Sequence, residues 1–168
     1  MPVIQKLDSN QGFSVDQKVI VDELRNAKDL NSLEIKNRNY QESYTSYNIL
    51  RGSNTAILST DLVGSQIILP DNTISFITGK IVAANEIGNA FYNAKIESCV
   101  NTNNIGASTV QGSMTTVIKD SIPSGQTWDI VPFIGGGSNK FSYSTTRAGT
   151  TLSIRWLVYT EVINIEWL

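Results

Sequence analysis

The sequence contains no histidine. Hydrolases whose general base is a histidine, zinc sites that contain histidine and histidine pH switches are therefore excluded. Only one cysteine is present, Cys99, so the chain closes no internal disulfide and offers no cysteine cluster for zinc or for an iron–sulfur centre. The fold must therefore rest on packing and hydrogen bonds, and we expect no cofactor.

Charge is also scarce, since Asp, Glu, Lys and Arg make up 17% of the residues and the net charge is -2. A chain without a basic excess has no electrostatic footprint for nucleic acid. No apolar run reaches the roughly 18 residues of a membrane span, and residues 1–7 lack the apolar core of a secretion signal. We therefore expect a soluble protein with no nucleic-acid partner and no membrane insertion.

Uncharged polar residues are abundant: 18 Ser, 15 Thr and 16 Asn stand among the 168 residues. This composition favours strands and turns over helices. A chain of this length, 40% of it hydrophobic, is long enough to bury a sizeable core in one domain.

The charged residues are concentrated near the start, because residues 1–42 hold 13 of the 28. We predict two parts, an N-terminal segment over 1–42 and a β domain over 43–168. Within the first part, Ser14 and Gln17 have capping-box spacing and apolar residues follow at steps of three and four. We therefore predict a helix over residues 15–30.

After Tyr44 the apolar pattern changes to a period of two, broken by turn residues. The predicted strands span 43–50, 55–59, 65–69, 73–84, 90–100, 112–119, 127–134, 140–145 and 151–163. Nine short strands without crossover helices predict a mainly β fold, a two-sheet β-sandwich of jelly-roll or immunoglobulin-like type with a short N-terminal helical segment.

Two predicted strands each have one clearly apolar face. Ile154, Trp156 and Val158 share one face of the first strand, and Tyr92 and Ile96 share one face of the second. Two further runs, 67–69 and 131–134, are apolar on consecutive residues, so both of their faces require cover, which a partner chain could provide. Pro132 lacks a backbone donor and predicts an edge strand.

Several segments of the β part resemble a domain found in bacteriophage virion and tail-fibre proteins. These segments are Ile49–Gly52 with Asn54–Thr55, Ile67–Pro70 with Asn72–Thr73, Phe76 with Ile81–Ala84, Gly88–Tyr92 with Lys95–Glu97, Trp128–Ile130, and Thr151–Val158 with Thr160–Val162. The resemblance covers about residues 44–166, and its motifs are structural. It implies a virion surface component, made in the host cytoplasm, that is a head fibre, a tail fibre or a capsid decoration protein.

From this resemblance and the apolar faces we expect a non-enzymatic homo-oligomer, with a trimer favoured because a closed ring covers edges and faces. The N-terminal segment would then attach to other virion proteins. The absence of a heptad array or repeat favours a short knob over a long shaft. Loops 101–108 and 135–139 are the candidates for host attachment.

Several aromatic residues are candidates for ligand binding. Arg155 beside Trp156 could contact a ligand, as could Trp128, but strand alternation already explains a core Trp with an outward Arg. Five tyrosines could stack on a sugar, yet they are spread over four strands, so packing is favoured. They are Tyr44, Tyr47, Tyr92, Tyr143 and Tyr159.

Three segments have the composition of an ion or phosphate site. Residues 135–138, Gly-Gly-Gly-Ser, lack the following helix that a phosphate cradle needs, so a hairpin loop is favoured. Residues 8–12 and 101–104 offer oxygen ligands without the full calcium-loop spacing. We therefore predict no metal site.

Paired acids for glycoside cleavage would be Asp120 with Asp129, or Glu161 with Glu97, although nothing in the spacing selects them over solvated surface acids. Cys99 faces away from the apolar side of its strand and has only Lys95 near it in sequence, which argues against a reactive thiolate. The alternative to a virion knob, which could itself engage a host-surface glycan, is a carbohydrate-binding module; a small hydrolase ranks third.

Overall fold

The computed structural model describes residues 13–15, 18–21, 27, 30 and 32–167. The described residues form twelve strands and contain no helix. The chain divides into two compact units, Met1–Asn31 and Ser32–Leu168, and each is described by itself.

The described part of the first unit is a small antiparallel pair, β1 (Phe13–Val15) with β2 (Lys18–Val21). The predicted helix over 15–30 is therefore wrong. Residues 19–21 are Val-Ile-Val, three consecutive β-branched residues whose side chains suit an extended backbone, and this preference outweighs the capping-box spacing. Residues 16–17, 22–26 and 28–29 lie outside the described residues.

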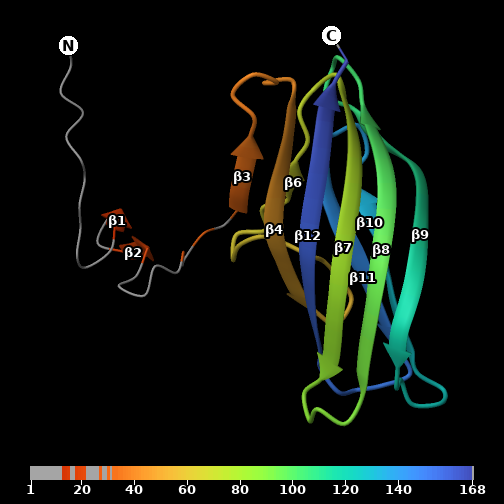
Figure 1. Cartoon of the computed structure of the whole chain (residues 1–168). Coiled ribbons are helices and arrows are strands. Elements are labelled where there is room, and N and C mark those ends of the chain that lie inside the picture. The colour runs from red at the N-terminus through yellow and green to blue at the C-terminus, as the bar shows by residue number, and fades with distance from the viewer. Residues whose placement is uncertain (1–12, 16–17, 22–26, 28–29, 31, 168) are drawn as a thin grey trace. The chain divides into compact units, whose positions relative to one another are not determined.

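The second unit contains a six-stranded antiparallel sheet, which faces the viewer in Figure 1. In spatial order its strands are β3 (Ser32–Lys36), β4 (Ser43–Ser53), β12 (Ile154–Glu166), β7 (Thr73–Asn85), β8 (Phe91–Thr102) and β9 (Ser108–Asp120). The strand that comes last in sequence, β12, thus lies between β4 and β7 in the middle of the sheet.

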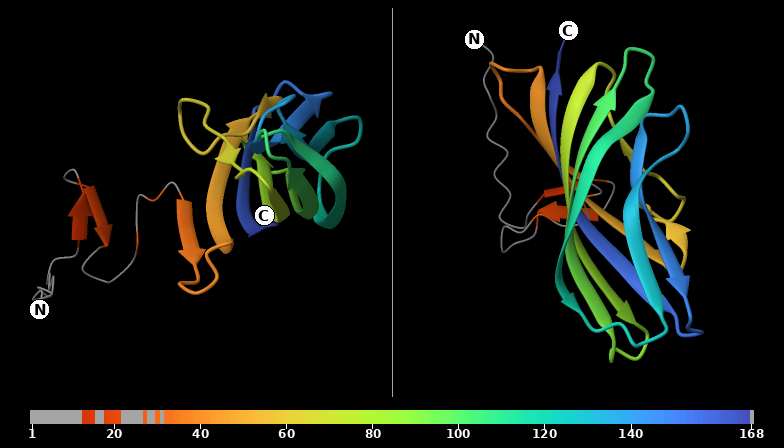
Figure 2. Two further views of the ribbon diagram at one scale, coloured as in Figure 1. Left: turned by 90° about the horizontal axis from the view of Figure 1, so that it is seen from above. Right: turned by 90° about the vertical axis from the view of Figure 1, so that its right-hand side faces the viewer.

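A four-stranded sheet lies against one face of the larger sheet (Figures 1 and 2). Its strands are β10 (Thr127–Ile134), β11 (Lys140–Ala148), β5 (Ala56–Ile57) and β6 (Ile67–Ile68). All nine strands predicted from the alternation are confirmed, and the mainly β architecture with them. Together with β3, which was not predicted, they make ten strands, divided six and four between the two sheets, and β7, β8 and β9 form a meander.

The face of the large sheet that contacts the small sheet is called the inner face, and the opposite one the outer face. Trp156 of β12 is 1% exposed on the inner face, where its ring meets the edge of Trp128 from β10 at 6.4 Å between centroids. Edge-to-face aromatic pairs add to the free energy of burial. The two one-sided strands of the prediction are confirmed, because Val158 and Ile96 are both fully buried on this face.

The turn residue Asn54 holds three strands together. Asn54 has a positive φ of 60°, and its side-chain Oδ1 accepts the backbone N–H of Ile154 at 3.0 Å. The backbone oxygen of Asn54 accepts a hydrogen bond from the indole of Trp156 at 3.0 Å and one from the hydroxyl of Thr145 at 2.8 Å. One turn residue therefore joins β4 to the start of β12 and to β11.

The edge position predicted for Pro132 is confirmed, since among the described residues β10 pairs only with β11. The two faces of the run 67–69 differ in solvent exposure. Ile67 is 6% exposed and Leu69 is fully buried, but Ile68 is 65% exposed. A single copy of the chain therefore leaves one face of this run uncovered.

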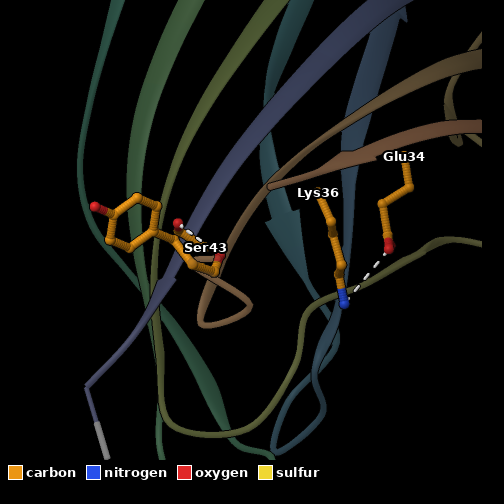
Figure 3. Close-up of polar contacts among 4 residues, drawn as sticks. Glu34, Lys36 and Ser43 are labelled. Carbon is orange, nitrogen blue, oxygen red and sulfur yellow. Dashed lines mark hydrogen bonds and ion pairs between the residues drawn. The ribbon is translucent and has the colours of Figure 1, made fainter. Parts of the chain in front are cut away.

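Figure 3 shows the connection between β3 and β4. The backbone oxygen of Tyr40 accepts hydrogen bonds from the backbone N–H and the hydroxyl of Ser43, both at 3.3 Å. On β3, Lys36 forms an ion pair with Glu34 at 3.5 Å. The Lys36 ammonium also lies 4.5 Å from the centroid of the Tyr44 ring. These contacts fix the edge strand β3 against β4.

Candidate functional site

The outer face of the six-stranded sheet carries a pair of tyrosines at its centre. Tyr47 of β4 and Tyr159 of β12 have ring centroids 6.1 Å apart and ring planes inclined by 21°. Lys80 of β7, directly opposite Tyr159 in the ladder, places its ammonium 5.7 Å from the Tyr159 ring centroid. Two aromatic rings and a cation are thus presented together on one surface.

Carboxylates and amines cross this face in two neighbouring rows. Glu161 lies opposite Tyr47, and partial burial together with this carboxylate raises the pKa of the Tyr47 phenol. Glu97 lies in the same row on β8 and forms an ion pair with Lys95 at 2.7 Å. An acidic row therefore runs beside a basic row that contains Lys80 and Lys95.

Next to these rows the outer face is apolar. The register places Ile35, Thr45, Ile163, Phe76 and Cys99 in one row across five strands, with Ile165 opposite Ile74 in the row beside it. Phe76 and Ile163 are each 47% exposed. We call the five apolar side chains of these two rows the apolar rows; they are Ile35, Ile163, Phe76, Ile165 and Ile74.

A depression of about 390 Å³ lies at the β9 end of the apolar rows. Phe76, Cys99 and Met114 line it, and Gly112 is opposite Cys99 in the ladder. The depression exists because Gly112 contributes no side chain, and a Cβ atom there would have no heavy atom within 4 Å. The outer face therefore lacks one side chain near the β9 edge of the sheet.

The prediction that strand alternation accounts for Arg155, Trp156 and Trp128, with the indoles in the core and the Arg outward, is confirmed. Both indoles lie in the core, and Arg155 is exposed on the outer face. The five tyrosines do not form one platform, because Tyr92 and Tyr143 are buried in the core. Tyr47 and Tyr159 alone among the five form a stacked pair.

The glycine-rich loop follows the hairpin prediction, since β11 succeeds it and pairs antiparallel with β10. Ser138 donates its backbone N–H and its hydroxyl to the oxygen of Gly135, at 3.0 and 2.9 Å. The backbone N–H of Ser108 donates to the oxygen of Ser138 at 3.1 Å. The two loops named as attachment candidates, 101–108 and 135–139, are therefore in contact.

The ion-site candidates have other partners or lie outside the description. The carboxamide oxygen of Asn103 accepts the backbone N–H groups of Ile105 and Ala107, at 3.1 and 2.9 Å, and so shapes its own loop. Residues 8–12 fall outside the described residues. Over 13–15, 18–21, 27, 30 and 32–167, no three His, Cys, Asp or Glu side chains are grouped as metal ligands would be. None of the described segments is a helix suited to spanning a bilayer.

Of the two possible acid pairs, Glu161 and Glu97 lie in one row of the outer face with Thr78 between them. Two strand spacings separate their Cα atoms by about 10 Å. Asp120 and Asp129 both act on Tyr92, whose pKa is raised by burial and then by these two carboxylates. The sequence offered Glu161 and Glu97 as a possible pair but could not place them in one row, because that depends on β7 pairing with both β12 and β8.

Two features were missed at the sequence level. Lys80 gave no signal, since its place beside Tyr159 follows from ladder register alone. The loop at 60–66 exposes Leu62 and Val63 fully or nearly so, while Asp61 accepts the backbone N–H groups of Val63 and Ser65 at 3.0 and 2.9 Å. Its Asp-Leu-Val-Gly sequence, with the acid two residues before the bonded N–H, was the available signal.

No family model matches the chain, and no curated protein matches its sequence. Two solved structures similar to it are phage tailspikes. The tailspike protein gp49 of Acinetobacter baumannii bacteriophage Fri1, described as a capsular polysaccharide depolymerase, aligns with a TM-score of 0.49 at 16% identity and covers 89% of this chain and 22% of its own. The tailspike of Acinetobacter baumannii phage AM24 aligns with a TM-score of 0.33 at 12% identity, over 73% of this chain and 26% of its own. The chain thus spans about a quarter of each tailspike or less.

Proposed function

We propose that this chain is a structural domain of a phage virion, a fibre or decoration knob that is displayed on the particle as a homo-oligomer. The observation that carries the proposal is the pair of apolar rows, in which exposed Ile35, Ile163 and Phe76 run across one sheet face beside Ile165 and Ile74. Contiguous exposed apolar side chains mark an interaction surface. Copies of the same chain would cover this surface in a virion part whose chains have no internal disulfide.

The proposed oligomer is a trimer in which the outer faces turn toward the axis. A closed ring buries the same surface on every copy and leaves none open to further growth. The residue motifs over 44–166 that resemble virion and tail-fibre domains support the setting. In this proposal the displayed domain spans 43–168, residues 1–42 carry the attachment to other virion proteins, and β3 joins that segment to the sheet.

Light scattering after size-exclusion chromatography tests the oligomer directly. At micromolar concentration we expect three times the chain mass of 18.4 kDa. Ile163→Asp should reduce the mass to that of one chain, because it places a charge in the covered face. Val131→Asp is the matched control, since Val131 is equally exposed at 47% but lies on the small sheet. A monomeric wild-type chain would contradict the proposal.

Host attachment through the two touching loops is the finer part of the proposal. Ile105 lies 79% exposed in one loop, and the hydrogen bond from Ser108 to Ser138 holds that loop against the other. Replacing the side chains of 103–105 and 138–139 by alanine should reduce adsorption of the phage to its host. Unchanged adsorption would remove this part and leave the structural role standing.

A carbohydrate-binding module is the second candidate function, favoured by the Tyr47 and Tyr159 pair beside Glu161 and Lys80. Stacked aromatic side chains with nearby polar groups suit the apolar and hydroxyl-bearing faces of a sugar. A glycan array on the purified chain should then show micromolar binding that Tyr159→Ala abolishes. Tyr40→Ala is the control, since Tyr40 is 61% exposed in the β3–β4 turn. The two functions exclude each other on this face, because a covering copy would bury both rings.

The proposal assigns no reaction to the chain. Incubation with capsular polysaccharide from the host should therefore release no reducing ends. Release that Glu161→Gln or Glu97→Gln abolishes would replace the structural role by a hydrolase, the third class considered.

A further inference from the structure

The two edges of the six-stranded sheet are β3 and β9; β3 carries the charged residues Glu34 and Lys36, whereas β9 differs from the edge at β10 in how it is protected. A proline or a charged side chain commonly blunts an exposed edge against pairing with another chain. β10 has Pro132. β9 has neither a proline nor a charged residue from Ser108 to Ile118, although among the described residues it pairs with a strand on one side only, β8.

The part of β9 that has neither a proline nor a charge includes a regularly paired stretch of defined length. Irregularities in the ladder interrupt its pairing with β8 on both sides of the stretch Gly112–Val117, and the six residues between are regularly paired. Every residue from Gln111 to Asp120 is exposed. The stretch therefore projects past the cover of the small sheet, and the backbone groups along its outer edge have no partner among the described residues.

The opposite edge, β3, matches this stretch in length and exposure. It has five residues, all exposed. The charged side chains of Glu34 and Lys36 lie on the inner side, because their ladder partners Ser46 and Tyr44 do. Leu33 and Ile35 lie on the outer side. The outward backbone edge of β3 has no partner among the described residues, and its two sides differ sharply in polarity.

We infer that the β9 edge of one copy pairs antiparallel with the β3 edge of the next copy and so continues the sheet from subunit to subunit. This rests on the proposed function, which needs all copies to point the same way. In an antiparallel sheet of six strands the two edges run in opposite directions, so β9 and β3 of identically oriented copies meet as an antiparallel pair. Pairing β9 with a second β9 would instead set the two copies in opposite orientations.

Side-chain alternation requires outer residues of β9 to meet outer residues of β3, and the depression at Gly112 favours one of the registers that satisfy this. With Met114 opposite Leu33 of the next copy, Gly112 falls opposite Ile35, and both pairs lie on the outer face. The Ile35 side chain then enters the depression of about 390 Å³ beside Phe76 and Cys99. On the inner side, Ser113 meets the polar Glu34. The junction thus has apolar pairs on the outer face and a polar pair on the inner side. A large residue opposite a glycine in a neighbouring strand also supplies the side-chain contact that the glycine lacks.

Cysteine cross-linking tests the pairing in the 168-residue chain with Cys99→Ser, a substitution that removes the native thiol. A mixture of Met114→Cys and Leu33→Cys chains should oxidise to a covalent dimer of the two variants. Met114→Cys mixed with Glu34→Cys is the matched control, because those side chains lie on opposite faces. Met114→Cys alone should give no dimer; a dimer there would overturn the inference in favour of β9 pairing with β9.

Gly112→Val gives an independent measurement of the same junction. A side chain has space at Gly112 in a single copy, so the fold should persist with unchanged circular dichroism, while the mass falls to one chain because Ile35 of the neighbour is displaced. Thr116→Val, on the same strand and face, should keep the oligomer.

The outcomes separate the two proposals. An oligomeric wild type with no cross-link between the Met114→Cys and Leu33→Cys chains overturns the edge pairing alone. A monomeric wild type overturns both.

Discussion

The hydroxyl of Tyr143 in β11 lies against the backbone of Gly79 in β7, in the space that a Cβ atom on Gly79 would occupy. The Tyr143 ring is fully buried and meets the edge of Phe141 at 5.2 Å between centroids. Burial raises the pKa of the Tyr143 phenol. The two sheets therefore approach each other at a glycine, and the phenol fills the resulting gap.

Gly79→Ala should destabilise the domain. The added methyl would stand 2.8 Å from Tyr143 Cζ and 3.0 Å from Val158 Cγ1, so rigid core groups must shift. Overpacking of this kind costs about 1–3 kcal/mol in the free energy of unfolding. Urea unfolding measures the loss, and Tyr143→Phe in the same chain should restore part of it. Gly136→Ala is the control, because a Cβ there meets nothing within 4 Å; equal losses at both glycines would contradict the explanation.

Asn54 offers a second prediction, since its side chain and its backbone conformation contribute separately. Asn54→Ala removes the hydrogen bond to the N–H of Ile154 and places a Cβ-bearing residue without a compensating polar group at a φ of 60°. We expect a loss of about 1–3 kcal/mol in the free energy of unfolding. Asn54→Gly keeps the conformation accessible and should lose less. Thermal unfolding that ranks glycine below alanine would show that the conformation is not the limiting factor.

The Asp61 loop should respond to acid. Hydrogen bonds from Ser65, and then from the backbone of Val63, hold the pKa of the Asp61 carboxyl below its usual value of 3.8. A depressed pKa means that the carboxylate bonds are fully present above the usual value and disappear as the pH falls through the lower one. Amide chemical shifts of Val63 and Ser65 should follow this titration, and Asp61→Asn should abolish it. A midpoint at or above 3.8 would show that these bonds do not form in solution.

Alkaline pH should weaken the domain through Tyr44. Burial, and then the carboxylates of Glu34 and Glu166, raise the pKa of its phenol from 10.0 to about 12. Between these values the unfolded chain releases the proton and the folded chain retains it, so stability falls as the pH rises from about 10 to 12 and is unaffected by this group below 10. Urea unfolding across that range measures the fall, which Tyr44→Phe should reduce. An identical pH dependence in the variant would assign the fall to other tyrosines.

The local pattern of the sequence predicted nine of the ten strands of the second unit, all but β3, but it did not predict which strands are neighbours. Alternation identified the buried face of β12 and the edge character of Pro132, because both depend on properties of single residues and their spacing. The failure at residues 15–30 has the same origin: apolar residues at Val19 and Ile20 fit a helical period as well as a strand, and β-branching was the feature that decided.

The candidate site was much less accessible to prediction. Tyr47 and Tyr159 are over a hundred positions apart, and their contact depends on β12 lying beside β4. The apolar rows and the depression at Gly112 likewise arise from the ladder register across five or more strands. Period-two patterns show which face a residue occupies, but the register between distant strands is a property of the whole sheet.

The central place of β12 has a consequence for biosynthesis. β12 pairs with both β4 and β7, so neither strand can pair on that side until residues 154–166 have left the ribosome. The edges of β4 and β7 that β12 will cover stay unpaired while the roughly seventy residues between β7 and β12 are translated. Nascent strands with unpaired edges are prone to pair with another chain. Assembly of the main sheet is therefore a late event, and a chaperone that shields β7 during elongation should raise the yield of native protein.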